Sequence, residues 1–204
     1  MKTAILAGVD DAVSARIQRE LEARGWQVHA LRTRWQPDAA FAVQSLCGSC
    51  ARADMVILHT DDGLARENAD ILEPIDDALA AEEYDRLCLW PLRVLNALMP
   101  FLQAGEGKRI CLVTTGEGSQ SLCRDTRGYG RRMALAALNL AMKQLFNQLH
   151  PLGYTFRLYG GGGQTGEYAA EFFTRDRSYE PEDPLHSDEN RLVLHNEQGG
   201  EIPW

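Results

Sequence analysis

The chain has 204 residues, of which 45% are hydrophobic and 25% charged, a balance that fits one globular domain with a sizeable core. Its formal net charge of −8 argues against nucleic acid or an anionic membrane as the main partner. No apolar run approaches the roughly 20 residues of a membrane helix. A first strand beginning after Lys2 leaves no room for a signal peptide, so we expect a cytoplasmic protein.

The first thirty residues have the pattern of a strand, a helix and a second strand. Residues 4–7 form a short apolar run typical of a buried parallel strand, and apolar residues then recur at helical spacing over 15–23. Gly25 ends that helix, and residues 28–31 begin the next strand. This alternation predicts an α/β fold.

The turn before the first helix contains Gly8, Asp10 and Asp11. In nucleotide-binding proteins, glycines in this turn let the backbone approach a pyrophosphate held at the helix N-terminus. A carboxylate about 5 Å from a phosphate would cost roughly 3 kcal/mol at an effective dielectric near 20. The interpretation that we favour is that an Asp caps the helix by accepting hydrogen bonds from its first N–H groups. Such a cap fills the anion site.

The middle of the chain continues the alternation. Residues 53–60 predict another buried strand only about twenty residues after the second one. An intervening strand and helix must therefore be short, and we place them at residues 41–43 and in a helix through Cys50. Residues 81–104 have a helical pattern in which Pro91 starts a new turn or makes a kink. Residues 108–115 predict the next strand.

Three segments match motifs of a known family. Residues 7–14 align without gaps with T-G-x-x-x-G-x-G, and residues 108–115 match G-R-I-V-x-x-S-S. The segment from Tyr129 to Asn139 resembles Y-x-x-x-K-A-A-L-N but is two residues longer. The chain therefore resembles the short-chain dehydrogenase/reductase family over residues 1 to about 165. The resemblance implies one Rossmann-type domain over residues 1–204, with a doubly wound parallel sheet in three α/β/α layers. Residues 165–204 would supply a helix, a loop and a last strand.

The resemblance also implies where catalytic residues would lie. Tyr129 would be the general acid or base, and Thr115 would replace the serine that binds the substrate carbonyl. The family's lysine is replaced by Met133, which cannot lower the pKa of a tyrosine; Arg132 could supply part of that charge. The family's Asn, which orders a water for proton relay, falls near Leu87 or Cys88, and neither can replace it.

The cofactor motifs have lost residues as well. Gly8 remains in the first turn, but the other two glycines are replaced by Ala12 and Ser14. Gly162 lies in a run of four glycines where the family contacts the nicotinamide, although flexible turns use such runs too. Arg32, or Arg34 beside it, follows the second strand and could meet the 2′-phosphate of NADP.

The helix over residues 133–142 is apolar on nearly every side, so we expect it to be buried all round. The family buries this helix and the preceding one in a four-helix bundle between subunits. The resemblance thus implies a homo-oligomer or a hetero-oligomer with an active relative. The alternative is that the chain's own C-terminal segment covers the helix, and we expect Trp204 to anchor against the body or a neighbour.

The cysteines and histidines give only weak evidence for a metal or redox site. Cys47 and Cys50 have the spacing of a metal or redox pair, but no two further ligands lie at zinc spacing. We expect structural thiols and no metal, with a redox pair or a zinc site as the alternatives.

Two functions are consistent with these residues. The first is a catalytically degenerate relative of these enzymes, needing no cofactor, that acts as a structural or regulatory subunit. The second is a divergent NADP(H)-dependent oxidoreductase of the carbonyl reductase or alcohol dehydrogenase type that uses Tyr129 and Thr115.

Overall fold

The computed structural model describes residues 1–8, 10–31, 43–44, 46, 48–60, 72–161, 166–175 and 191–204. Helices and strands alternate along these residues, as the hydrophobic pattern predicts. In chain order the elements are β1 (Thr3–Gly8), α1 (Ala12–Ala23), β2 (Gln27–Leu31), β3 (Met55–His59), α3 (Asp77–Tyr84), η1 (Asp85–Leu89), α4 (Trp90–Ala104), β4 (Arg109–Val113), η2 (Gly116–Gly118), α5 (Tyr129–Leu149), η3 (His150–Leu152), β5 (Thr155–Tyr159), α6 (Gly166–Thr174), β6 (Leu194–His195) and β7 (Glu201–Ile202).

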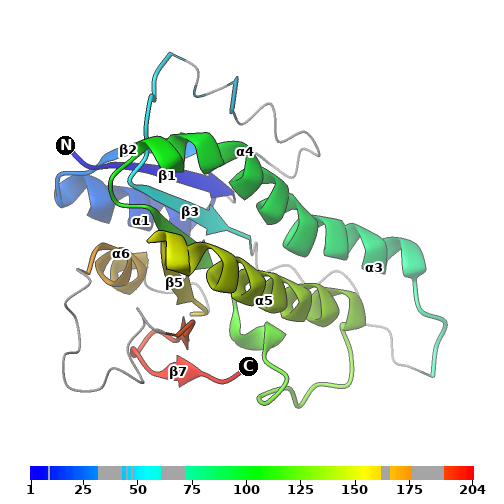
Figure 1. Cartoon of the computed structure of the whole chain (residues 1–204). Coiled ribbons are helices and arrows are strands. Elements are labelled where there is room, and N and C mark those ends of the chain that lie inside the picture. The colour runs from blue at the N-terminus through cyan, green and yellow to red at the C-terminus, as the bar shows by residue number, and fades with distance from the viewer. Residues whose placement is uncertain are drawn as a thin grey trace.

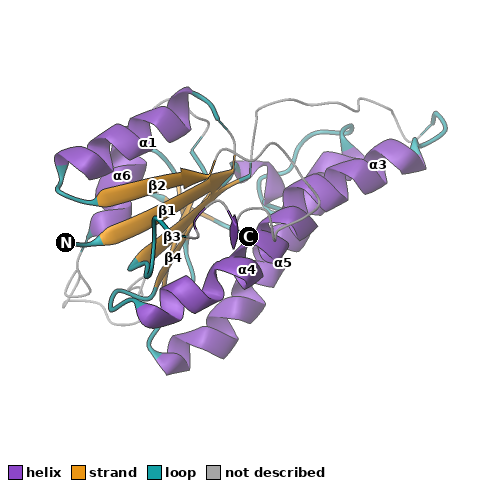
Figure 2. Ribbon diagram, turned by 90° about the horizontal axis from the view of Figure 1, so that it is seen from above, coloured by secondary structure: helices purple, strands orange, loops and turns teal. Residues whose placement is uncertain are grey.

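The strands form one sheet in the order β2-β1-β3-β4-β5-β6-β7. Neighbouring strands are parallel, except that β7 runs antiparallel to β6. Helices α1 and α6 cover one face of the sheet, and α4 and α5 cover the other (Figures 1 and 2). This confirms the doubly wound, three-layer α/β/α prediction. Because β2 and β3 lie on opposite sides of β1, the connections reverse direction at the carboxyl ends of β1 and β3, where such folds bind ligands.

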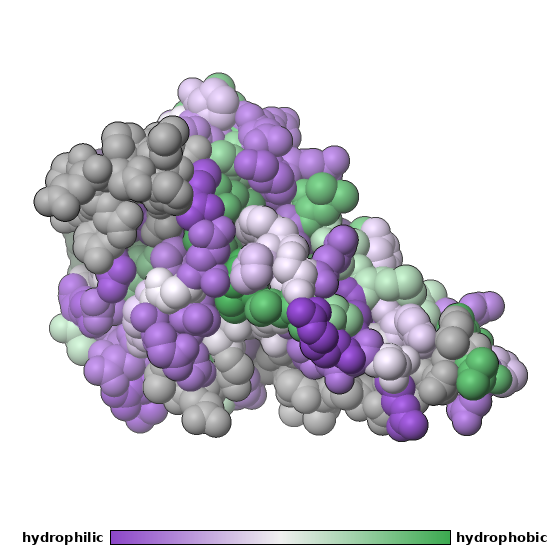
Figure 3. All heavy atoms as spheres, turned by 90° about the horizontal axis from the view of Figure 1, so that it is seen from below, coloured by the Kyte–Doolittle hydropathy of each residue, from purple (hydrophilic) through white to green (hydrophobic). Residues whose placement is uncertain are grey.

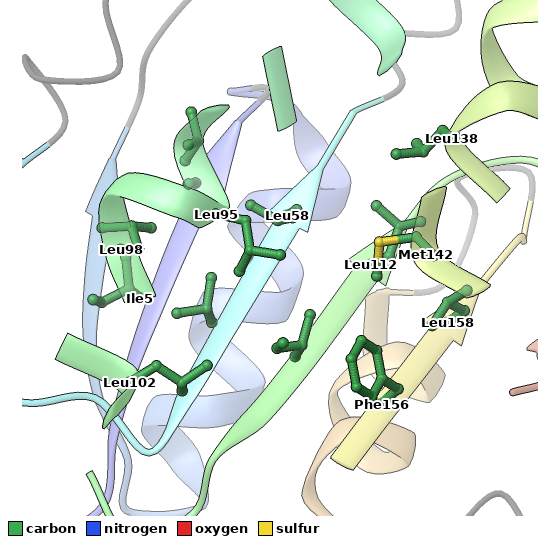
Figure 4. Packing of buried hydrophobic residues seen from close by; sticks show 14 of the residues in the cluster. Ile5, Leu58, Leu95, Leu98, Leu102, Leu112, Leu138, Met142, Phe156 and Leu158 are labelled. Carbon is green, nitrogen blue, oxygen red and sulfur yellow. The ribbon is translucent and has the colours of Figure 1, made fainter. Parts of the chain in front are cut away.

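Two hydrophobic cores form because side chains of a strand alternate between the faces of the sheet. On β1, Ala4 and Leu6 pack with α1 and α6, whereas Ile5 and Ala7 pack with α4 and α5. Figure 4 shows the second core, in which side chains of α4 and α5 lie over the strands. Its labelled residues are Ile5, Leu58, Leu95, Leu98, Leu102, Leu112, Leu138, Met142, Phe156 and Leu158.

The long helical pattern before β4 is one continuous helix, because α3, η1 and α4 follow one another without a break. The middle part, η1, is a π-helix that ends just before Pro91. A proline lacks an N–H and its ring crowds the carbonyl four residues earlier, so a widened turn accommodates Pro91. Residues 77–104 are long and apolar enough to span a membrane by length and composition alone. The buried residues of α4, however, pack on the sheet as those of a core helix do.

One expectation about the helices is wrong: Val43, which we placed in a short strand, is helical, while residues 41 and 42 lie outside the described residues. Helix α5 keeps an exposed face in the single chain, where Met133 is 56% and Leu140 63% exposed, so the described part of this chain does not supply the second cover that we expect for it. The face that they occupy points away from the sheet. In Figures 1 and 2, α3 and the first half of α5 also extend beyond the sheet, side by side.

Asp54 holds the opposite, amino end of the sheet together. Its buried carboxylate accepts hydrogen bonds from the backbone N–H of Thr3 at 2.8 Å, of Glu106 at 3.0 Å and of Gly107 at 3.2 Å. Burial alone would raise the pKa of Asp54, but these three donors and the charge of Arg52 outweigh it, so the pKa lies below its usual value. Asp54 thereby links β1, the start of β3 and the turn before β4.

Replacing Asp54 by Asn should reduce the free energy of unfolding by roughly 2–3 kcal/mol at pH 7, because an amide accepts these hydrogen bonds less strongly than a carboxylate. A carboxyl with a lowered folded-state pKa contributes stability that is present above its unfolded pKa of about 4. This stability is lost as the pH falls through the folded-state pKa. Urea denaturation of both proteins between pH 7 and pH 3 should therefore show the difference shrinking. A difference that stays constant over this range would contradict the assignment.

Candidate functional site

The N-terminus of α1 lies at the carboxyl edge of the sheet, next to the ends of β1 and β3. Asp11 is the N-cap of this helix, and its carboxylate accepts a hydrogen bond from the N–H of Ser14 at 2.8 Å. This confirms that an Asp caps the helix. The helix thus uses its own carboxylate at the place where a helix N-terminus would bind an anion.

His59, at the end of β3, lies against the N-terminus of α1 from the other side. Its Nδ1 lies 2.7 Å from the Ser14 hydroxyl and 3.7 Å from Oδ1 of Asp11. Ser14 and His59 are both buried. A hydrolytic triad would need the serine and the carboxylate on opposite ring nitrogens, but here both lie next to Nδ1. The three side chains therefore form a structural network rather than a catalytic triad.

Gly8 is required by strand packing at this position. Its φ of +135° is rarely adopted by residues with a side chain, and a Cβ there would lie 2.0 Å from the carbonyl oxygen of His59. The cavity beside Gly8, lined also by Ser14 and Leu31, measures about 10 Å³, which is room for about one water molecule. This cavity is too small for a dinucleotide. Arg32, Arg34 and Gly162 lie outside the described residues.

Thr115 lies just beyond β4, where the sequence places the carbonyl-binding hydroxyl. It begins the short helix η2, and its hydroxyl accepts a hydrogen bond of 3.4 Å from the N–H of Glu117. Tyr129 begins α5, at the end of this helix that projects from the sheet (Figure 1). Within the described part of the chain, no hydrogen bond joins Tyr129 to Thr115. The structure thus does not bring the two predicted catalytic hydroxyls into contact.

Arginines of α5 occupy the space next to η2. Arg131 is buried and its Nε donates to Oε2 of Glu117 at 2.6 Å. Arg132 pairs with Asp125 and lies 3.7 Å from the other oxygen of Glu117. The charge of Arg132 is therefore balanced by two carboxylates, in a position where it was expected to support Tyr129.

The alignment that starts at Tyr129 needs two extra residues before the final A-A-L-N of the motif. An alignment without a gap is obtained by starting from those last four residues. If residues 136–139 are the A-A-L-N, the lysine position is Leu135 and the tyrosine position is Arg131. The structure brings these two residues to η2, because a Cβ on Gly118 would lie 3.0 Å from Cβ of Leu135, and Arg131 binds Glu117. Counting back from Asn139 would have found Arg131 from the sequence. No motif in the sequence would have identified Glu117 or His59.

A buried ion pair lies on the adjoining helix. Nη2 of Arg86 is 3.7 Å from Oε1 of Glu83, and both side chains are almost completely buried. Arg86 belongs to the π-helix η1, one residue before Leu87 and Cys88, where the sequence places the family's missing Asn. Leu87 and Cys88 are buried as well. A charged pair thus occurs on the turn that would otherwise hold the relay residue.

The thiols and histidines form no metal site in the described part of the chain, where no group of three possible ligands comes together. Cys50 is free, and its thiol donates to the carbonyl of Arg52 at 3.2 Å. Burial raises the pKa of the Cys50 thiol, and the bond to Arg52 only partly opposes this. A raised thiol pKa does not favour redox chemistry. Cys47 lies outside the described residues.

Comparisons with known proteins identify one curated relative and several solved structures that are similar to this chain. No protein-family model matches the chain. The curated protein C-signal of Myxococcus xanthus is 32% identical over 142 residues, which are 65% of this chain and 83% of C-signal. A carbonyl reductase from Pseudomonas aeruginosa PAO1, solved in complex with NADP, is similar over the whole of both chains, with a TM-score of 0.73 and 17% identity. A candidate carbonyl reductase, Sniffer of Caenorhabditis elegans, has a TM-score of 0.76 and 13% identity over 99% of each chain.

Proposed function

The chain belongs to the short-chain dehydrogenase/reductase family, and we propose that it is a non-catalytic member that serves as a structural or regulatory subunit of a homo- or hetero-oligomer. The observation that carries this proposal is the capped N-terminus of α1, where Asp11, Ser14 and His59 contact one another at the position that the family resemblance gives to the pyrophosphate. The relative from Myxococcus xanthus has the name of a signal rather than of an enzyme, which favours a regulatory role.

Electrostatics at this position oppose a dinucleotide. A phosphate there would displace the bond from Ser14 to Asp11 and would face a carboxylate. At about 5 Å and an effective dielectric near 20, this repulsion costs roughly 3 kcal/mol, which is about a hundredfold in affinity. The loss of the cap hydrogen bond adds about 1 kcal/mol.

The position of the catalytic pair supports the same proposal. In the reading of the motif without a gap, Arg131 replaces the tyrosine and Leu135 the lysine. A guanidinium cannot act as a general acid or base near neutral pH, because it stays protonated in proteins. Its salt bridge to Glu117 also occupies the space beside Thr115.

An exposed apolar surface supports the role as a subunit. Met133 and Leu140 are exposed on α5, and residues 141–149 of the same helix line a groove of about 570 Å³ between α4 and α5. Leu92, Met99, Ala141 and Leu145 contribute apolar side chains to the groove. We call this surface the α4/α5 face. Exposed apolar surface on two adjacent helices favours packing against a second subunit.

Purified protein should show no saturable change of tryptophan fluorescence with NADH or NADPH below about 1 mM, because the site for the pyrophosphate is occupied. The same samples should not turn over a panel of ketones and alcohols with either cofactor. Binding of either cofactor in the micromolar range would contradict the proposal.

One observation favours the second function, a divergent NADP(H)-dependent oxidoreductase: the similar carbonyl reductase from Pseudomonas aeruginosa PAO1 was solved with NADP. In that case Tyr129, Thr115 and Arg132 would act together, with Gly8, Arg32 and Gly162 at the cofactor. Replacing Tyr129 by Phe distinguishes the two functions. Turnover that is present in the wild type and abolished by Tyr129→Phe would establish the oxidoreductase, whereas we expect no turnover in either protein.

A further inference from the structure

A cavity lies at the amino edge of the sheet, opposite the carboxyl edge that carries the candidate site. It measures about 440 Å³, which is within the size range of small-molecule sites. Residues at or just before the beginnings of β1, β2, β3 and β4 line it, together with the end of α6. Hydrophilic and hydrophobic side chains are interspersed over the face of the molecule in Figure 3, and the cavity has the same mixed character. Its charged and aromatic lining residues are Lys2, Trp26, Arg52, Asp54, Glu106 and Arg109.

Lys2 brings an ammonium group to the cavity, and Trp26 brings an indole ring. Nζ of Lys2 lies 5.5 Å from the ring centre of Trp26, which is within the range of a cation–π contact. Lys2 forms no salt bridge within the described part of the chain. The charge of Lys2 can therefore pair with an anion, while its contact with the indole restricts where the ammonium group lies.

Two charged side chains in the walls are held in place by the protein itself. The carboxylate of Asp54 accepts the three backbone hydrogen bonds described above. Nη1 of Arg109 donates to the carbonyls of Phe173 at 2.6 Å and of Arg175 at 2.7 Å, and its Nε donates to the hydroxyl of Thr155 at 3.2 Å. Asp54 and Arg109 thus form fixed walls of the cavity.

Arg52 is the second cation that a ligand can reach. Its Nη1 lies 3.3 Å from Oε1 of Glu106, but the two side chains are 48% and 87% exposed. A salt bridge between such exposed side chains contributes little free energy, so the carboxylate of a ligand can replace that of Glu106. The planar guanidinium of Arg52 offers parallel N–H donors, which fit a carboxylate.

The charges of the lining favour a ligand with a single negative charge. The charged side chains are the cations Lys2, Arg52 and Arg109 and the carboxylates Asp54 and Glu106, so the cations are in excess by one. Asp54 stays ionised near neutral pH, because its backbone donors and the charge of Arg52 hold its pKa below the usual value. A dianion would therefore be repelled by Asp54 more strongly than a monoanion.

We propose that this cavity binds a small aromatic carboxylate. The carboxylate of the ligand pairs with Lys2 and Arg52, and its ring packs against the indole of Trp26. Open α/β sheets bind their substrates and cofactors at the carboxyl ends of the strands, so a ligand at the amino edge occupies a separate site. The inference goes beyond the proposed function and does not depend on whether the protein is an enzyme.

Benzoate is the probe for this site, and benzamide is its neutral isostere. Titration of the full-length protein near pH 7, followed by tryptophan fluorescence, should give saturable binding of benzoate with a Kd of about 1 mM. Benzamide should bind about tenfold more weakly, because it cannot form charge-assisted hydrogen bonds. Raising the salt concentration from about 0.05 M to about 0.5 M should weaken the binding of benzoate and leave that of benzamide unchanged. Trp26→Phe should remove the fluorescence change.

Replacing Lys2 by Met, or Arg52 by Gln, should abolish most of the tenfold preference for benzoate. Lys143→Met is the matched control, because Lys143 makes the same kind of contact, with the ring of Phe146 at 5.0 Å, outside this cavity. This control should keep the preference, and circular dichroism identifies variants that fail to fold.

Three results would overturn the proposal. The first is equal binding of benzoate and benzamide to the wild type, or no binding up to their solubility limits. The second is a preference for benzoate that neither Lys2→Met nor Arg52→Gln reduces. The third is displacement of benzoate by inorganic phosphate at equal concentration, which would show a site for anions in general with no place for the ring.

Discussion

Replacing Leu140 by Glu should prevent the proposed oligomer from forming. Leu140 is 63% exposed in the single chain and lies on the α4/α5 face, so a second subunit would bury the new carboxylate without a partner. An unpaired charge in an interface costs about 3–5 kcal/mol, which weakens association by a factor of about 10² to 10⁴. Sedimentation velocity at micromolar concentration should show an oligomer for the wild type and a monomer for Leu140→Glu.

The control for this experiment is Leu152→Glu. Leu152 is also 63% exposed but lies in η3, after the end of α5. Exposed substitutions of this kind change the free energy of unfolding by about 0.5 kcal/mol or less, so both variants should stay folded. A wild type that sediments as a monomer, or equal dissociation by both variants, would contradict the α4/α5 face as the interface.

Replacing Glu83 by Leu should destabilise the protein strongly. Glu83 and Arg86 are almost completely buried and lie 3.7 Å apart, so the substitution removes a carboxylate from beside a buried guanidinium. Breaking a buried pair in this way costs about 3–5 kcal/mol. The melting temperature should therefore fall by roughly 6–20 °C, which calorimetry or thermal circular dichroism measures.

The double variant Glu83→Leu with Arg86→Met should recover most of this loss, because two apolar side chains then replace both charges. Glu82→Leu, at an exposed neighbouring position, serves as the control and should change the free energy of unfolding by about 0.5 kcal/mol or less. A loss below about 1 kcal/mol for Glu83→Leu would show that the pair does not contribute as described.

Sequence alone determined much of the fold, because the relevant interactions are local. The apolar residues 4–7 and 53–60 predict buried strands, and the structure places β1 and β3 there. An Asp of the first turn was expected to cap α1, and Asp11 does so, by a contact between residues three positions apart. Pro91 marked the disturbed turn in the helix before β4. In each case a few neighbouring residues contain the whole physical cause.

Only the tertiary structure decided what fills the candidate site. His59 meets Ser14 across 45 residues because β1 and β3 pair in parallel, and Arg131 meets Glu117 because the chain between η2 and α5 brings the two elements together. Nothing near these residues in sequence favours either contact. The geometry of the sheet and of the crossover connections fixes which distant side chains meet. It therefore also decides where a carboxylate, an imidazole or a guanidinium lies in the space that a ligand would need.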